Sequence, residues 1–266
     1  MRPGIAHEAC APGFEHDGAY SCAPILPADT CPPGLMAVPG ETACRPVMTC
    51  GEGQWGDIPI DATTVYVDEN YAGTDSDGSA AKPWTTIGAA ASAAPTGALI
   101  AIAAGSYAED MVITNKSVRI WGVCPERVEI VGLGSGFATI DIVQGASGTE
   151  VHGLSIRGNG RGIGLSGSVD VVVDSVWVHD LTLGGIDLAS AFGPTNAVVR
   201  GSLVEATRVA GIFSSGADAT IEASVVRGTL PHLSLQLFGE GIAIQVPCPE
   251  GPCLVDERPN VTVRGS

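Results

Sequence analysis

The stretch Leu154-Ser-Ile-Arg-Gly158 decides the fold, because the chain repeats its pattern three more times. The later copies are Asp174-Ser-Val-Trp-Val178, Gly201-Ser-Leu-Val-Glu205 and Ala223-Ser-Val-Val-Arg227. The serines of the four copies are separated by 20, 27 and 22 residues. A Gly-Ile pair follows each copy, at Gly162-Ile163, Gly185-Ile186, Gly211-Ile212 and Gly241-Ile242. A repeat of this length indicates a solenoid.

Short Val- and Ile-rich strands within each period, with glycines between them, predict an all-β parallel β-helix. In this solenoid each coil leaves its backbone groups to be paired by the next coil. A leucine-rich repeat has a similar period, but its Leu-x-x-Leu-x-Leu signature is missing. The β-branched residues and glycines argue against helical repeats. We therefore expect β-helix coils over residues 97–266.

The region before the coils has the features of a solenoid entrance. Thr64-Val-Tyr-Val-Asp68 alternates like a strand, and residues 86–94 form an Ala-rich stretch with Thr85 or Thr86 near its N-cap. Because an open solenoid end exposes unpaired strand groups, we expect residues 57–96 to supply a strand and a short capping helix. At the other end, Val261-Thr-Val-Arg-Gly-Ser266 begins another repeat and stops. We interpret this as truncation at the C-terminus.

Residues 1–56 are rich in cysteine, proline and glycine and predict a small module stapled by disulfides. The chain has eight cysteines and no C-x-x-C pair, which argues against zinc. Cys248 and Cys253 flank a turn-forming Pro-Glu-Gly-Pro and are predicted to pair. The pairing of the other six cysteines is left open. Five of them lie near the N-terminus and need a sixth to pair completely, and Cys124 is the natural candidate. The six are Cys10, Cys22, Cys31, Cys44, Cys50 and Cys124.

Composition excludes several classes of protein. The 266 residues carry a net charge of -16, which gives no basic footprint for nucleic acid. The hydrophobic fraction of 45% is too high for a disordered chain. The longest apolar run, residues 98–104, is too short to span a membrane. The cysteines predict an extracellular or cell-surface location; since no signal peptide is visible, the export signal, or a lipid anchor, is expected upstream.

The residues 65–122 also carry a family resemblance. They resemble the N-terminal region of secreted right-handed parallel β-helix proteins of the pectate-lyase-like superfamily, in the branch with a DUF1565-type segment. The motifs are Val65-Tyr-Val-Asp68, Gly73-Thr-Asp-Ser-Asp-Gly-Ser79, Pro83-Trp-Thr-Thr-Ile87, Ala98-Leu-Ile-Ala-Ile-Ala-Ala-Gly-Ser-Tyr107 and Val118-Arg-Ile-Trp-Gly122. The Cys-rich leader is similar to that of related myxobacterial surface proteins. The resemblance implies a right-handed coil, export and carbohydrate as ligand, and it brings no catalytic residues.

The catalytic motifs of the better-known enzymes of that superfamily are missing from the sequence. It has no Asp-Asp pair, no Gly-His-Gly and no Arg-x-Pro-x-x-Arg. Val176-Trp-Val-His-Asp180 is similar to the Trp-Ile-Asp-His of pectate lyases with His and Asp exchanged. His179 and Asp180 are therefore candidate acid/base residues, with Asp187 as a third candidate on an outer face. Strand alternation places His179 outward beside Trp177, so the alternative is a solvated strand end.

Two further segments contain candidate ligand-binding residues. Asp75 and Asp77 are spaced like oxygen ligands of Ca²⁺, the only cofactor that the sequence suggests, but the terminal Glu of an EF-hand loop is missing and an Asx-rich turn is the favoured explanation. The excursion over residues 229–259 interrupts the repeat and contains His232 and Glu240. It is the candidate specificity region, and a plain decorated loop is the alternative.

We therefore predict an exported β-helix that serves as a surface binding or structural module, with carbohydrate as the expected ligand. Candidate binding residues are Trp177, His232 and Glu240. Because of its charge, the protein should prefer neutral or cationic partners to polyuronates. The alternative is a polysaccharide lyase, hydrolase or epimerase with its site on an outer sheet face near His179 and Asp187, although fold alone supports it weakly.

Overall fold

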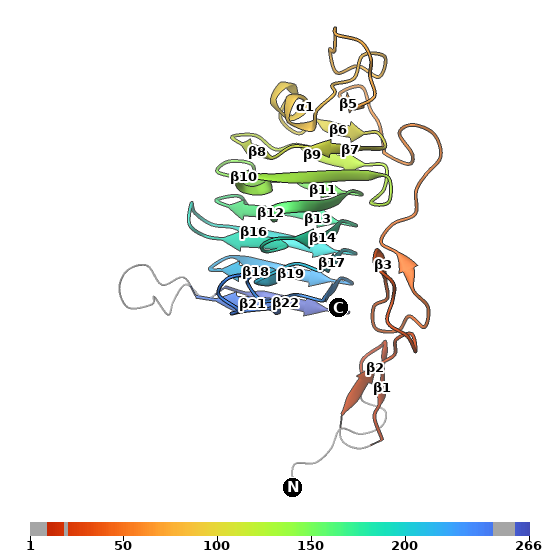
Figure 1. The fold of residues 1–266 in the computed structure, drawn as a ribbon, viewed down its shortest axis with the longest axis vertical. Coiled ribbons are helices and arrows are strands. Elements are labelled where there is room, and N and C mark those ends of the chain that lie inside the picture. Colours follow the sequence, from red (N-terminus) through yellow and green to blue (C-terminus); the bar gives the residue numbers. More distant parts are fainter. Residues whose placement is uncertain (1–9, 19–20, 247–258) are drawn as a thin grey trace.

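The computed structural model describes residues 10–18, 21–246 and 259–266. The chain forms a parallel β-solenoid whose coils are stacked along the long axis in Figure 1. Helix α1 lies at one end of the stack and strands β21 and β22 lie at the other, while the Cys-rich leader runs along one side (Figure 1). The predicted fold class is confirmed.

One sheet of the solenoid has eight strands, each paired in parallel with its neighbours. Successive coils contribute one strand each, so the order in the sheet follows the order in the sequence. The strands are β5 (Val65–Val67), β6 (Leu99–Ile102), β9 (Arg119–Gly122), β11 (Glu150–His152), β13 (Val171–Asp174), β16 (Asn196–Arg200), β19 (Asp218–Glu222) and β22 (Val261–Arg264).

The second sheet has ten strands in two rows, joined by the long strands β10 (Val128–Val143) and β12 (Ser155–Ser166). The first row pairs with the beginning of these strands and the second row with their end. The first row contains β7 (Gly105–Ala108), β14 (Trp177–Leu181), β17 (Leu203–Glu205) and β20 (Val225–Arg227). The second row contains β8 (Met111–Thr114), β15 (Ile186–Ala189), β18 (Ala210–Ser215) and β21 (Glu240–Gln245).

The Gly-Ile anchors fall in one register, as the repeat predicts. Ile163, Ile186, Ile212 and Ile242 pair successively across four coils, and the first three are essentially buried. At the first three of these positions, the glycine before the isoleucine is required by a close approach. A Cβ on Gly185 would lie 2.4 Å from the carbonyl oxygen of Gly211 in the next coil, closer than any real Cβ contact.

The serine anchors, in contrast, do not share one register. Trp177 pairs with both Ser155 and Leu203, so Ser175 lies one residue ahead of the position that Ser202 occupies. Ser175 stands in the left-handed corner conformation with φ 55°, as does Gly201 with φ 56°. Ser155 pairs with Trp177 itself and so lies one residue after the position of Ser202. The sequence match therefore aligned small polar residues from three neighbouring positions.

The predicted capping helix is present as α1 (Ile87–Ala93). Thr86 is its N-cap, and its hydroxyl accepts a hydrogen bond from the amide of Ala89 at 3.3 Å. The Glu109 carboxylate accepts the amides of Ile87 and Gly88, which lack partners within the helix. The buried face of α1 therefore covers the end of the core next to β6 and β8. Within the described residues, no helix is long and apolar enough to cross a membrane.

The leader contains two short antiparallel pairs, β1 (Phe14–His16) with β2 (Cys22–Pro24) and β3 (Leu35–Met36) with β4 (Arg45–Pro46). Its disulfides are Cys10–Cys22, Cys31–Cys44 and Cys50–Cys124. The last bond ties the leader to the solenoid, the link that an odd number of leader cysteines requires. The predicted Cys248–Cys253 pair lies outside the described residues.

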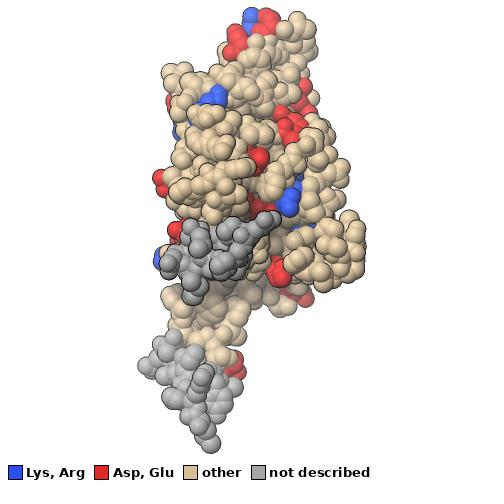
Figure 2. All heavy atoms as spheres, turned by 90° about the vertical axis from the view of Figure 1, so that its left-hand side faces the viewer, with Lys and Arg blue, Asp and Glu red and all other residues tan. Residues whose placement is uncertain are grey.

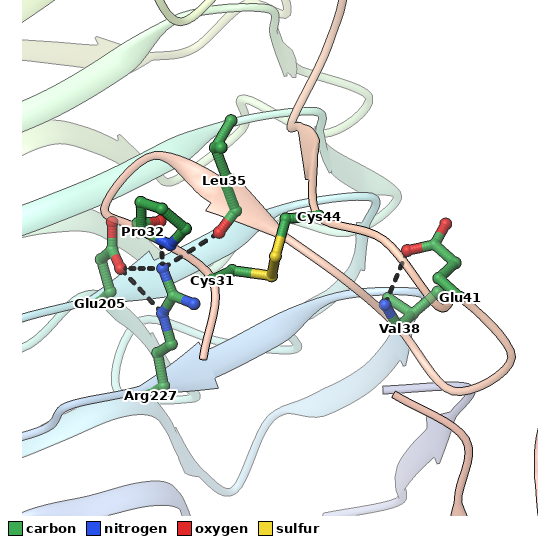
Figure 3. Close-up of a disulfide and its surroundings, with 8 residues drawn as sticks. All are labelled: Cys31, Pro32, Leu35, Val38, Glu41, Cys44, Glu205 and Arg227. Atoms are coloured by element: carbon green, nitrogen blue, oxygen red, sulfur yellow. Dashed lines mark hydrogen bonds and ion pairs between the residues drawn. A yellow bond between two sulfur atoms is a disulfide. The ribbon is translucent and has the colours of Figure 1, made fainter. Parts of the chain in front are cut away.

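Residues 31–48, which we call the leader loop, pack on the outer face of the first row. Met36 and Leu203 are completely buried against each other and against Val47. Close to this contact, Glu205 accepts a hydrogen bond from the Gly34 amide at 2.8 Å. It also accepts hydrogen bonds from Arg227, as Figure 3 shows. These contacts fix the leader loop on the flank of the solenoid.

Candidate functional site

A pocket of about 430 Å³ opens on the outer face of the second row. Strands β12, β15, β18 and β21 supply its floor, and the segment just before β21 supplies part of its rim. The lining residues that matter for its chemistry are Arg161, Gly184, Asp187, Phe213, Phe238 and Glu240. The space-filling view in Figure 2 shows a side of the molecule on which uncharged atoms predominate and charged side chains form small scattered groups.

The repeat register explains why Asp187 and Phe213 point into the pocket. Each follows an inward isoleucine of the Gly-Ile anchor, so strand alternation turns it outward. Asp141 and Gly164 occupy the same outward column in earlier coils. A Cβ on Gly164 would lie 2.7 Å from Asp141 Oδ1, so this carboxylate extends over the glycine.

Asp187 is the most buried acidic group of the pocket, with 9% of its surface exposed. Arg161 Nε donates a hydrogen bond to Asp187 Oδ2 at 2.5 Å, and the guanidinium lies 4.5 Å above the Phe137 ring. Burial raises the pKa of Asp187, although the charge and hydrogen bond of Arg161 oppose the shift. Burial also raises the pKa of Asp141.

The second oxygen of Asp187, Oδ1, is buried and has no hydrogen-bond partner. A Cβ on Gly184 would come within 2.5 Å of this oxygen. Both residues line the pocket, and Gly184 packs directly against the buried Oδ1. Glu240 and Phe238 are exposed at the rim.

The structure brings two of the predicted site residues, Asp187 and Glu240, into this pocket. Phe238 comes from the excursion that the sequence marks as a specificity region. Sequence reasoning missed Arg161 and Phe213. Both are adjacent to a Gly-Ile anchor, one before Gly162 and one after Ile212, so listing the outward neighbours of the anchors would have found them.

Trp177 and His179 lie together in the first row, outside this pocket. Their rings are stacked at 3.7 Å, and His179 Nδ1 lies 2.8 Å from Asp180 Oδ2. The expectation of a solvated strand end is wrong for His179, whose side chain is only 7% exposed. The leader loop covers the tryptophan, since a Cβ on Gly34 would lie 3.1 Å from its ring. His179 and Asp187 therefore belong to different rows.

The other predicted residues are held by local contacts. Asp75 accepts the hydroxyl of Tyr71 and pairs with Lys82, while Asp77 accepts the amide of Ser79 in an Asx turn. His232 Nδ1 accepts the amides of the next turn. In the described part of the chain, no group of three or more His, Cys, Asp or Glu is arranged to hold a metal ion.

The pocket thus combines two aromatic rings with an ion pair and a free carboxylate oxygen on a rigid sheet. Comparison of the chain with protein-family models, with curated proteins and with solved structures found no match.

Proposed function

We propose that this chain is an extracellular module that binds carbohydrate in the pocket around Asp187. Three disulfides and a β-solenoid fit an extracellular module. The observation that carries the proposal is the pairing of Phe213 and Phe238 with Arg161, Asp187 and Glu240 in one cavity.

This combination suits the chemistry of a sugar. Its ring carbons present apolar C–H faces, which pack on aromatic side chains, while its hydroxyls exchange hydrogen bonds with carboxylates and guanidinium groups. The cavity of about 430 Å³ lies within the range of about 300–1,000 Å³ that is usual for small-molecule sites. Because the floor is β-sheet, little ordering is needed on binding.

The proposal also names the class of ligand. The resemblance of residues 65–122 to the pectate-lyase-like superfamily and its DUF1565-type segment supports carbohydrate in general. The net charge of -16 disfavours a polyuronate and favours a neutral or cationic glycan.

A polysaccharide panel tests the proposal on the full, oxidised chain. Saturable binding of at least one neutral or cationic glycan is expected, with loss of affinity in Phe213→Ala. No binding across the panel, or binding that Phe213→Ala leaves unchanged, would contradict it.

A second candidate function, polysaccharide cleavage, is favoured by Asp141 and Asp187. The two carboxylates stand two strands apart across Gly164, a separation of about 9.5 Å between the strands. Burial raises the pKa of both, and cleavage of a glycosidic bond uses an acid and a base of this kind. Following reducing and unsaturated sugar ends in the same panel tests this function. New ends that disappear in Asp141→Asn would support it.

A further inference from the structure

Asp187 Oδ1 is a buried carboxylate oxygen that the described protein leaves without a donor. Arg161 is engaged with the other oxygen and with the ring of Phe137. An unpaired buried acceptor raises the free energy of the empty pocket, so a ligand that brings a donor to Oδ1 gains affinity. Asp187 and Gly184, whose Cβ would lie 2.5 Å from Oδ1, both line the pocket, so the donor would approach from that side.

The charge balance of the pocket favours a cationic donor. Among the described residues that line it, Arg161 is the only basic one, and Asp187 and Glu240 are acidic. The pocket therefore carries one net negative charge when both carboxylates are ionised. Asp141 adds a further carboxyl group along the same outward column. The net charge of -16 for the whole chain reinforces the attraction of a cation.

We infer that the pocket binds the protonated amine of a glycan with free amino groups, such as a polymer of 2-amino-2-deoxyglucose. This inference rests on the proposed carbohydrate-binding function. An ammonium group has three N–H donors, enough to meet Asp187 Oδ1 and Glu240 together. Hydrogen bonds between two ionised groups are stronger than neutral ones. The sugar ring beside the amine packs on Phe213.

The titration of Asp187 is consistent with this ligand. Burial raises the pKa of Asp187 in the empty pocket, with Arg161 opposing the shift. A bound ammonium adds a second positive charge next to the carboxylate and favours its ionised form.

Paired oligosaccharides test the inference by calorimetric titration of the full, oxidised chain. The probes are a glucosamine hexamer, its N-acetylated counterpart and a glucose hexamer, at mildly acidic pH and moderate salt. Acetylation removes the charge and keeps the sugar backbone. We expect the free amine to bind at least about tenfold more tightly than the N-acetylated form, the effect of one charge-assisted hydrogen bond.

Variants locate the effect at Asp187. In Asp187→Asn the ratio of the two affinities should fall to near one, while Asp29→Asn, which removes the same charge from an exposed leader residue, should keep it. Glu240→Gln, at the exposed rim, should lower this ratio in part. It replaces Asp187→Asn in the test if a thermal melt shows that Asp187→Asn is unfolded.

The outcomes separate this inference from the proposed function. If the free and N-acetylated hexamers bind equally tightly and Phe213→Ala weakens the binding of both, the amine inference is overturned and carbohydrate binding remains supported. An amine preference that persists in folded Asp187→Asn would also overturn it, because general attraction of a polycation to an acidic protein would then explain the binding. If no hexamer and no glycan of the panel binds, the proposed function fails as well.

Discussion

Arg161 holds Asp187 through one carboxylate oxygen, with 2.5 Å between Nε and Oδ2, and leaves the other oxygen buried and unpartnered. The pair comes from adjacent coils of the second row, β12 and β15. A purely structural ion pair is usually satisfied on both oxygens when it is buried. The free oxygen is the feature on which our proposal of a ligand in this pocket rests.

The aromatic side chains of the pocket should contribute directly to glycan binding. Phe213→Ala is expected to weaken binding by about 1 kcal/mol, or roughly fivefold, because the sugar face loses its stacking surface. Phe192→Ala is the matched control, since Phe192 is 60% exposed and does not line the pocket. Titration of both variants with the best glycan of the panel checks this. Equal losses in the two would argue against stacking at Phe213.

Binding of an amino glycan should weaken as the pH falls through the pKa of Asp187. Burial raises that pKa, so the carboxylate is lost at a higher pH than for an ordinary aspartate. Arg161, Glu240 and Asp141 are the other charged side chains on this face. Affinity measured against pH should show this step in the wild type. The same step in Asp187→Asn would contradict its assignment to Asp187.

The glycine of the Gly-Ile anchor should be essential where the next coil approaches. Gly185→Ala is expected to destabilise the fold by about 2 kcal/mol, the usual effect of overpacking, because its Cβ would lie 2.4 Å from the Gly211 carbonyl oxygen. Gly241→Ala, at the same position of a later coil, would meet nothing closer than 3.7 Å and should be tolerated. Urea unfolding compares the two. Similar midpoints would show that coil spacing does not select glycine.

Glu205 should anchor the leader loop. Glu205→Gln is expected to cost about 3 kcal/mol, because the half-buried Arg227 loses its counter-charge. The control is Glu222→Gln, whose contact with Arg264 is exposed and 3.9 Å long, so its effect should stay within about 0.5 kcal/mol. Because Trp177 Nε1 donates to Glu205 at 2.9 Å, tryptophan fluorescence reports release of the loop. An unchanged spectrum and unchanged stability would contradict the anchoring role.

The Cys50–Cys124 bond should stabilise the solenoid more than the other disulfides do. It joins residues 74 apart, and closing a loop of that length removes about 4 kcal/mol of unfolded-chain entropy. The double variant Cys50→Ala/Cys124→Ala should therefore lower the melting temperature of the solenoid. Cys10→Ala/Cys22→Ala removes a bond within the leader and should leave that transition unchanged. Equal shifts would show that the leader and solenoid unfold as one unit.

The repeat predicted the fold because its strongest constraint is local and steric. Gly185 and Ile186 satisfy one close contact and one core position, so their spacing follows the coils. Ser175 was assigned one residue away from its true register because a small polar residue fits two neighbouring corner positions. The burial of His179 could not be read from the strand pattern, since the leader loop that covers Trp177 comes from residues far away in the sequence.

The candidate site was predicted only in fragments for a similar reason. Asp187 and Glu240 were singled out from the sequence, but their meeting depends on the register of β15, β18 and β21. The role of Arg161 depends on its ion pair with the next coil. The Gly-Ile anchors mark such residues as outward neighbours, but a single sequence does not show which of them pair across one irregular period.

Hydrogen exchange of the full chain, with and without the best-binding glycan of the panel, tests the location of the site most directly. We predict slower exchange on binding in β15, β18 and β21 and in residues 230–239, with little change in β14, β17 and the leader. Protection centred on Trp177 and the leader loop instead, with the second row unchanged, would contradict the assignment of the site to the Asp187 pocket.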